Sequence, residues 1–182
     1  MTMLLKEHVL PGLFVILPER RRDERGYFMR TYCREALLAA GIDFVPAQSS
    51  QSYSEKPATL RGLHVQRPPH MEDKIVRCPR GAIFDVAVDI CPGSADFGRW
   101  AGLELSEENG LALFIPKGFA HGFQTLRSET VVQYDIAPAY VASHAAGVRF
   151  DDPEIGIAWP QAGERFISAR DLGLPLLADL SL

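Results

Sequence analysis

Phe84-Asp85-Val86-Ala87-Val88-Asp89-Ile90 is the stretch that decides the fold class, because it alternates with the period of a β-strand. Its four bulky apolar side chains, at the even positions, fall on one face, while Asp85 and Asp89 fall on the other. Short runs of the same kind recur at positions 13–17, 60–66, 74–77, 100–105, 111–115 and 131–136. The sequence therefore predicts many short strands.

Turn sequences separate these runs, as at Pro92-Gly93-Ser94 and Pro116-Lys117-Gly118. Only the stretch at 34–40, Arg-Glu-Ala-Leu-Leu-Ala-Ala, predicts a helix, which Gly41 should end. Strands with frequent turns and one short N-terminal helix indicate an all-β protein, a sandwich or jelly roll. The irregular sequence after Pro160 is expected to wrap around this barrel.

Length and composition exclude several classes of protein. A chain of 182 residues, 47% of them hydrophobic, is expected to form one domain over residues 1–182. The net charge of −4 argues against nucleic-acid binding, and no apolar run approaches the roughly 20 residues that cross a bilayer. Three cysteines without CxxC spacing predict neither a disulfide framework nor a zinc site. Since no signal peptide is recognised at the start, the cytoplasm is the expected location.

The run at 60–66 carries two polar side chains that point to a site. A lone histidine in a strand is more often structural, but here Arg61 precedes His64 by three residues with a glycine between them. Strict alternation would place these two side chains on opposite faces. If both serve one site, the strand needs a bulge or bend near Gly62.

Two further segments offer candidate site residues. In the segment 114–123, a Pro-Gly turn precedes His121, which lies among small and aromatic residues. That pattern fits either the wall of a pocket or a simple hairpin turn with a hydrogen-bonded histidine. Tyr134 shares a strand face with Val132 and Ile136, so its hydroxyl is expected to point into the barrel, although such a tyrosine is often only a core residue.

Metal chemistry is not expected. Jelly rolls often hold metals through a His-x-His pair, whereas this chain has His64-Val65-Gln66, and glutamine is a poor ligand for a transition metal. His70 lies beyond two prolines and would need a rearranged loop to replace the missing imidazole. The sequence therefore predicts no metal.

Several longer blocks occur together in a fixed order between about Asp23 and Asp171. They are Arg61-Gly62-Leu63-His64-x-Gln66, Lys74-Ile75-Val76-Arg77, Gly81-x-x-Phe84-Asp85-Val86-x-Val88-Asp89, Phe97-Gly98-x-Trp100, Ile115-Pro116-x-Gly118-Phe119-Ala120-His121-Gly122-Phe123 and Asp152-Pro153-x-x-Gly156-Ile157-x-Trp159-Pro160. In these blocks the chain resembles the dTDP-4-dehydrorhamnose 3,5-epimerase family. The resemblance implies a cupin-type jelly roll, a homodimer that exchanges N-terminal strands, and epimerisation of a nucleotide-linked 4-keto-6-deoxysugar without metal or cofactor.

The resemblance also assigns roles to single residues. His64 corresponds to the base, Asp171 to the carboxylate that orients it, Tyr134 to the acid and Lys74 to the cation near the keto oxygen. A 4-keto group acidifies the hydrogens at C3 and C5, so such a base, acid and cation form a sensible set. The implied substrate-binding residues are Arg25, Phe28, Gln48, Arg61, His121, Tyr140 and Arg170.

Four positions depart from the commonest family pattern, namely Arg30, Ser50, Ala145 and Arg170. None removes a proposed catalytic group, but they leave the nucleotide base and the sugar open. One alternative is an enzyme that inverts only C3 or only C5, or that uses a CDP- or GDP-linked 4-ketosugar. A second is a cupin that binds a sugar nucleotide without turnover. The presence of both a base and an acid favours an enzyme over a simple binder.

Overall fold

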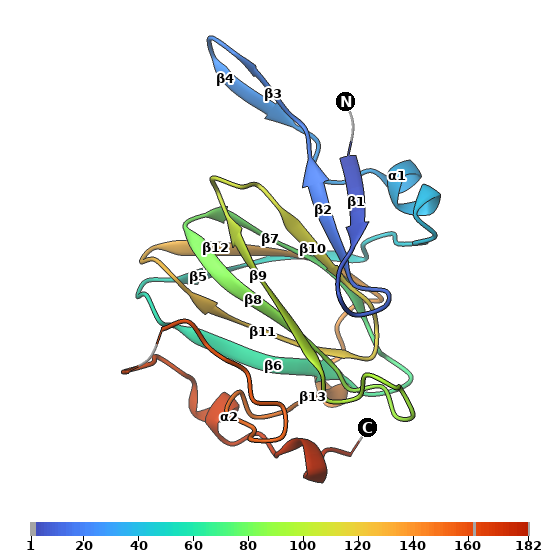
Figure 1. Cartoon of the computed structure of the whole chain (residues 1–182), viewed down its shortest axis with the longest axis vertical. Coiled ribbons are helices and arrows are strands. Elements are labelled where there is room, and N and C mark those ends of the chain that lie inside the picture. The colour runs from blue at the N-terminus through green and yellow to red at the C-terminus, as the bar shows by residue number, and fades with distance from the viewer. Residues whose placement is uncertain (1–2, 162, 182) are drawn as a thin grey trace.

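The computed structural model describes residues 3–161 and 163–181, and most of its strands form two facing antiparallel sheets (Figure 1). The first sheet has the order β1 (Met3–Glu7), β2 (Phe14–Pro18), β10 (Ala112–Ile115), β7 (Asp73–Arg80), β12 (Thr130–Ala137) and β5 (Gln48–Ser54). The second has the order β13 (Ala145–Gly147), β6 (Leu60–Gln66), β11 (Phe119–Thr125), β8 (Ala82–Asp89) and β9 (Trp100–Ser106). Because successive strands cross between the two sheets, the fold is the predicted jelly roll.

The remaining elements lie outside this pair of sheets. The hairpin of β3 (Arg20–Asp23) and β4 (Gly26–Met29) projects from the body of the molecule (Figure 1). Helix α1 (Arg34–Ala39) begins where the sequence predicts it, and Gly41 follows with a φ of +82°. The other short helices are η1 (Ala142–His144), α2 (Ala169–Leu172) and η2 (Leu177–Asp179). Among the described residues, none of the helices is long and apolar enough to span a membrane.

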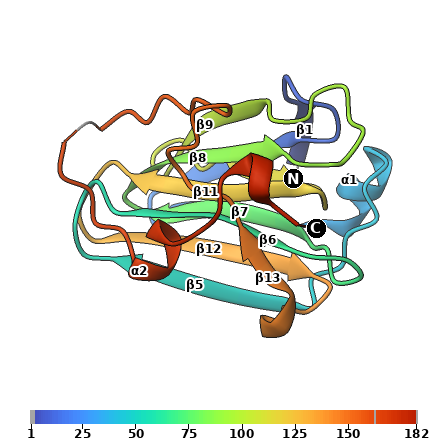
Figure 2. The same cartoon turned by 90° about the horizontal axis from the view of Figure 1, so that it is seen from below.

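Three apolar layers account for the large number of strands that are rich in hydrophobic residues. One layer lies between the sheets and includes Val76 and Val132. Another packs Leu37 of α1 against the outer face of the first sheet. A third packs the C-terminal segment, with Trp159, against the outer face of the second sheet (Figure 2). Strand β8 is buried on both faces, so even Asp85 is fully enclosed.

Each of the seven predicted runs overlaps a strand, with an end residue outside it in three of them, but several strands carry no apolar signal. Strand β3 reads Arg-Arg-Arg-Asp, and β5 reads Gln-Ser-Ser-Gln-Ser-Tyr-Ser at the edge of its sheet. An edge strand with one face toward solvent needs few apolar side chains, so its pattern is weak. The turn at 116–118 is not a hairpin, because β10 and β11 lie in different sheets.

The C-terminal segment wraps the second sheet, as the sequence predicts, and Asp152 fastens it. The buried Asp152 carboxylate accepts hydrogen bonds from the backbone N–H groups of Glu154 and Ile155, at 2.8 and 3.0 Å. Its second oxygen accepts the N–H of Leu177 at 2.7 Å. One side chain therefore ties the tail to the loop that follows β13.

We expect Asp152→Ala to lower the free energy of unfolding by about 2–4 kcal/mol, because buried backbone donors lose their acceptor. Urea denaturation checks this value. The matched control is Asp151→Ala, whose side chain is 41% exposed and forms a surface ion pair with Arg149. Such pairs contribute little, so the control should stay close to the parent protein. Equal losses for the two variants would contradict the anchoring role of Asp152.

Candidate active site

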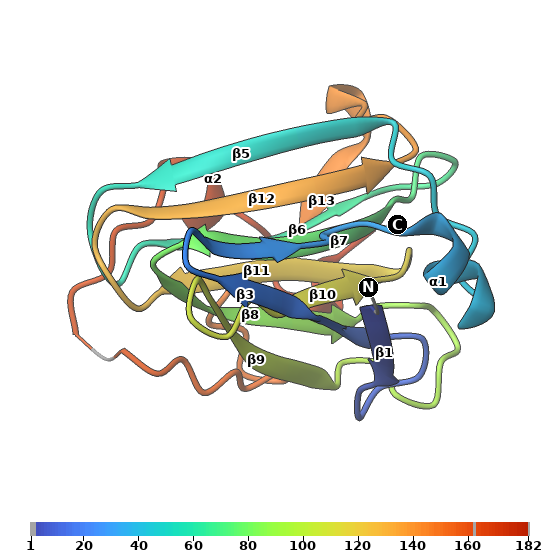
Figure 3. The same ribbon diagram turned by 90° about the horizontal axis from the view of Figure 1, so that it is seen from above.

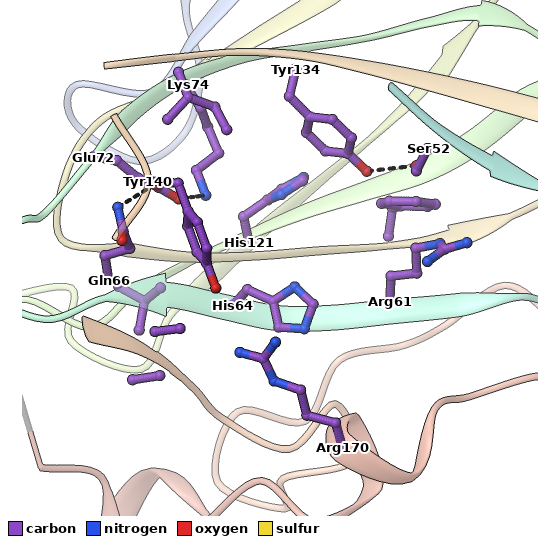
Figure 4. A pocket seen from close by; sticks show the side chains of 15 residues that line it. Ser52, Arg61, His64, Gln66, Glu72, Lys74, His121, Tyr134, Tyr140 and Arg170 are labelled. Carbon is purple, nitrogen blue, oxygen red and sulfur yellow. Dashed lines mark hydrogen bonds and ion pairs between the residues drawn. The ribbon is translucent and has the colours of Figure 1, made fainter. Parts of the chain in front are cut away.

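A cavity of about 280 Å³ opens between the two sheets, and we call it the central cavity (Figure 4). Its walls come from β5, β7 and β12 of one sheet and from β6, β11 and β13 of the other. The predicted site residues that line it are Arg61, His64, Lys74, His121, Tyr134, Tyr140 and Arg170. The fold thus gathers residues that lie more than a hundred positions apart in the sequence.

A β-bulge in β6 turns both Arg61 and His64 into the central cavity. The pairing of β6 with β11 shifts at this point, so that Gly62 and Leu63 together oppose the single residue Gly122. Leu63 packs outward in the apolar layer under the C-terminal segment, and the strand regains its alternation at His64. A Cβ atom on Gly62 would lie 2.6 Å from the Cα atom of Gly122, so only glycine fits. The bulge predicted near Gly62 is confirmed.

His64 is held by the carboxylate of Asp171. The Nε2 atom of His64 lies 2.8 Å from Oδ1 of Asp171, while Oδ2 accepts the backbone N–H of Gly62 at 3.1 Å. Burial raises the pKa of Asp171, but the hydrogen bonds from His64 and Gly62 outweigh it and leave the pKa below its usual value. Because a carboxylate only accepts, Nε2 carries the hydrogen and Nδ1 keeps the lone pair of a base.

Asp171 itself is placed by the C-terminal segment. It lies in α2, where its backbone N–H donates to Oγ of Ser168 at 3.0 Å and so caps the helix. Its side chain is 6% exposed, whereas that of His64 is 43% exposed. Asp171 lines a neighbouring cavity of about 590 Å³ that shares Arg61, His64 and Arg170 with the central cavity. The carboxylate therefore stands behind the imidazole.

Tyr134 faces His64 from the opposite sheet. It lies on the inner face of β12 together with Val132 and Ile136, as the alternation predicts. Its hydroxyl is within 3.0 Å of the hydroxyl of Ser52 on β5 (Figure 4). Burial raises the pKa of Tyr134, so the phenol stays protonated over the whole working pH range. The two sheets thus present a base and a protonated phenol to one space.

Lys74 is buried and paired. Its ammonium lies 2.7 Å from Oε1 of Glu72, and both side chains are less than a tenth exposed. Lys74 is therefore not a solvated charge at the end of a strand. Glu72 was not among the predicted site residues, although its spacing of two from Lys74 puts both on one face of an extended chain.

A second histidine–aspartate pair lies inside the barrel. The Nε2 atom of His121 is 2.7 Å from Oδ1 of Asp85, and the other oxygen of Asp85 is buried with no hydrogen-bond partner among the described residues. Asp85 was not predicted as a site residue. The sequence did contain a signal for it, because Asp85 lies in a strand of apolar residues. A carboxylate that is buried there is normally paired with another polar group.

Three predicted substrate-binding residues do not line the central cavity. Arg25 and Phe28 belong to the hairpin of β3 and β4, whose strand β3 is labelled in Figure 3. Arg25 pairs with Asp23 at 2.6 Å, and Phe28 is 70% exposed. Gln48 contacts the site indirectly, because its Oε1 atom accepts the backbone N–H of Tyr140 at 2.7 Å. The structure therefore brings together the residues of the barrel but not those of the hairpin.

The described part of the chain contains no group of three or more histidine, cysteine, aspartate or glutamate side chains arranged to hold a metal ion. The two histidines that line the central cavity, His64 and His121, each place Nε2 within hydrogen-bond distance of a carboxylate.

Comparison with known proteins identifies relatives over almost the whole chain. The family model for dTDP-4-dehydrorhamnose 3,5-epimerase matches residues 7–179. The enzyme of that name from Sinorhizobium fredii is 43% identical over 166 residues, which cover 91% of this chain and 85% of that protein. The crystal structure of the dTDP-6-deoxy-D-glucose-3,5-epimerase from Legionella pneumophila, in complex with dTDP-4-keto-L-rhamnose, superposes with a TM-score of 0.94 at 34% identity and covers 99% of this chain and 95% of that one.

A third relative is a monoepimerase. The crystal structure of a 3'-monoepimerase from Streptomyces bikiniensis, in complex with dTDP-quinovose, matches with a TM-score of 0.87 at 32% identity. The match covers 94% of this chain and 88% of that one.

Fold and site together define an enzyme of the cupin-type epimerase class. The chain belongs to the dTDP-4-dehydrorhamnose 3,5-epimerase family.

Proposed function

We propose that this protein inverts C3 and C5 of dTDP-4-dehydro-6-deoxy-D-glucose, as a step in the biosynthesis of a dTDP-L-rhamnose-type deoxysugar. The observation that carries the proposal is the pair of proton-transfer groups, His64 and Tyr134, on facing walls of one cavity. Inversion at carbon needs removal of a proton from one face and delivery of a proton to the other. A protein that only binds a sugar nucleotide needs neither group.

In the proposed mechanism His64 acts as the base. Its Nδ1 atom takes the proton from C3, and the electron pair of the C–H bond moves through the C3–C4 bond onto the keto oxygen. Asp171 stabilises the imidazolium that forms. The ammonium of Lys74 stabilises the negative charge on the enolate oxygen, and its burial strengthens this effect.

Tyr134 completes the inversion as the acid. Its O–H donates a proton to the opposite face of the same carbon, the electron pair returns from oxygen, and the ketone is restored. The imidazolium of His64 then releases its proton to solvent and the phenolate takes one up, which restores both groups. The same sequence at C5 inverts the second centre. The hydroxyl of Ser52, at 3.0 Å, is placed to stabilise the transient phenolate.

The remaining predicted residues are assigned to substrate binding. Arg61, His121, Tyr140 and Arg170 line the central cavity, and Gln48 holds the backbone beside Tyr140. We propose that Arg25 and Phe28 act in a homodimer, in which the hairpin of one chain reaches the site of the other. The exposed side chain of Phe28 supports this arrangement, because burial of an aromatic ring against a second chain is favourable.

Proton NMR of candidate substrates in deuterated water tests the proposed function. The protein should exchange both H3 and H5 of dTDP-4-dehydro-6-deoxy-D-glucose for deuterium and convert the sugar to the L-lyxo product. The same measurement with CDP- and GDP-linked 4-ketosugars identifies the nucleotide that the protein accepts. A protein that leaves all of these compounds unexchanged would overturn the proposal and favour a binding protein.

A second candidate is an epimerase that inverts a single centre. The likeness to a 3'-monoepimerase supports it, because the fold and the base are compatible with either outcome. Exchange confined to H3 in the same experiment would select this candidate.

We also propose that the protein needs no metal or other cofactor and works in the cytoplasm. The free cysteines Cys33, Cys78 and Cys91 fit a reducing compartment. Turnover should survive extended dialysis against a chelator, because no step of the mechanism uses a metal. Loss of turnover that a divalent ion restores would contradict this prediction.

A further inference from the structure

Gln66 lines the central cavity and has no role in the mechanism above. The residue is 1% exposed, and both the nitrogen and the oxygen of its side-chain amide form hydrogen bonds. The Nε2 atom donates to Oε2 of Glu72 at 2.7 Å and to the carbonyl oxygen of His70 at 3.1 Å. The Oε1 atom accepts the backbone N–H of Val141 at 2.6 Å.

These contacts join two parts of the site that come from different elements. Glu72 forms the ion pair with Lys74, so one arm of Gln66 reaches the buried cation through a single carboxylate (Figure 4). Val141 follows Tyr140, so the other arm holds the segment that carries this aromatic side chain. Gln66 lies on β6 of the second sheet, whereas Lys74 and the strand before Tyr140 belong to the first.

We propose that Gln66 is a positioning residue that sets the Lys74–Glu72 ion pair and the Tyr140 segment relative to each other; this inference rests on the proposed function. Its amide supplies what a carboxylate cannot, namely a donor to Glu72 without a second negative charge. No second negative charge is then added beside the ion pair, so the attraction of Lys74 for the developing enolate is not weakened beyond the effect of Glu72. The arm toward Val141 fixes the aromatic wall against which the substrate lies.

Gln66→Glu tests the two contacts separately. A glutamate keeps an oxygen that accepts the N–H of Val141, but its ionised form has no hydrogen to donate to Glu72. Two buried carboxylates side by side share one proton, which raises the pKa of the pair. At low pH the protonated glutamic acid still donates a hydrogen to Glu72 and mimics glutamine. At high pH the pair loses that proton and places an extra negative charge beside Lys74.

The measured quantity is kcat of Gln66→Glu divided by kcat of the parent protein at each pH between 6 and 9, with KM determined in parallel. We expect this ratio to fall by about tenfold or more as the pH rises, the factor that corresponds to one pKa unit of interaction between neighbouring charges. KM should change little, since the arm to Val141 remains. The ratio cancels the other titratable groups of the cavity, which both proteins share: Arg61, His64, His121, Tyr134, Tyr140 and Arg170.

Two further variants separate positioning from a merely structural effect. Gln124→Glu is the matched control, because Gln124 is also fully buried in a strand and exchanges hydrogen bonds with Gln161, but it does not line the central cavity. Its kcat ratio should be independent of pH. Gln66→Met removes both arms, so it should lower kcat and raise KM together.

An NMR readout tests the contacts without any substrate. In unliganded Gln66→Glu, the backbone amide signal of Val141 should titrate with the apparent pKa of the corresponding kcat/KM ratio, because kcat/KM reports the free protein. Parent protein that turns over its substrate, combined with a flat ratio in Gln66→Glu, would overturn the inference and leave the proposed function standing. Parent protein without turnover would overturn the proposed function and the catalytic part of the inference, while the Val141 signal would still decide whether the contacts exist.

Discussion

Replacing His64 by alanine is expected to abolish exchange of the C3 proton of the substrate while leaving the protein folded. His64 is the only group in the proposed mechanism that removes a proton from the sugar, and general-base catalysis is typically worth roughly a hundred- to ten-thousand-fold. The loss should therefore lie in this range when deuterium incorporation is followed by NMR. A loss of only about twofold, measured the same way, would remove His64 from the mechanism.

Two companion variants make the result specific to the base. His64→Ala leaves the buried carboxylate of Asp171 with fewer hydrogen bonds, so His64→Gln, whose amide can still donate to Asp171, separates loss of the base from disturbance of the fold. Both variants should fail to exchange. Asp171→Asn should be slower than the parent protein but less impaired than His64→Ala, because Asp171 orients and stabilises the base without taking the proton itself.

Replacing Tyr134 by phenylalanine is expected to separate removal of the proton from its return. The variant keeps the ring in its packed position and should still bind substrate and incorporate deuterium through His64. It should form far less inverted product, because the proton returns mostly from the face that it left. The pKa of Tyr134, raised by burial, supports its role as a donor, since the phenol stays protonated over the working pH range.

The control is Tyr32→Phe, which deletes an equivalent hydroxyl far from the chemistry. The Tyr32 hydroxyl donates to the carbonyl oxygen of Phe44 at 2.9 Å on the outer face of the first sheet, and the residue does not line the central cavity. Both variants should lose a similar, small amount of stability, about 0.5–1.5 kcal/mol. Epimerisation at the parent rate by Tyr134→Phe would show that another group or a water molecule is the acid.

The sequence by itself determined the fold class and the inward direction of several site residues. Alternation fixes the face of a strand on which a side chain lies, and this placed Tyr134 on the inner face of β12. Strict alternation would place Arg61 and His64 on opposite faces of the strand. A shared site for both therefore required a bulge near Gly62, and the structure contains it. The assignment of Asp171 depended on the family resemblance, because no local pattern links it to His64. The single domain over residues 1–182 and the homodimer stay predictions.

Only the tertiary structure decided which charged side chains become partners. Asp85 joins His121, 36 positions away, because β8 and β11 are neighbours in the second sheet. Gln66 joins Glu72 to Val141 because the bulged β6 faces the ends of β7 and β12 across the cavity. Local periodicity is a property of neighbours along one chain, whereas these contacts depend on the order of strands in two sheets and on how the sheets face each other. For that reason the sequence indicated the inward faces, and the packing of the sheets selected the pairs.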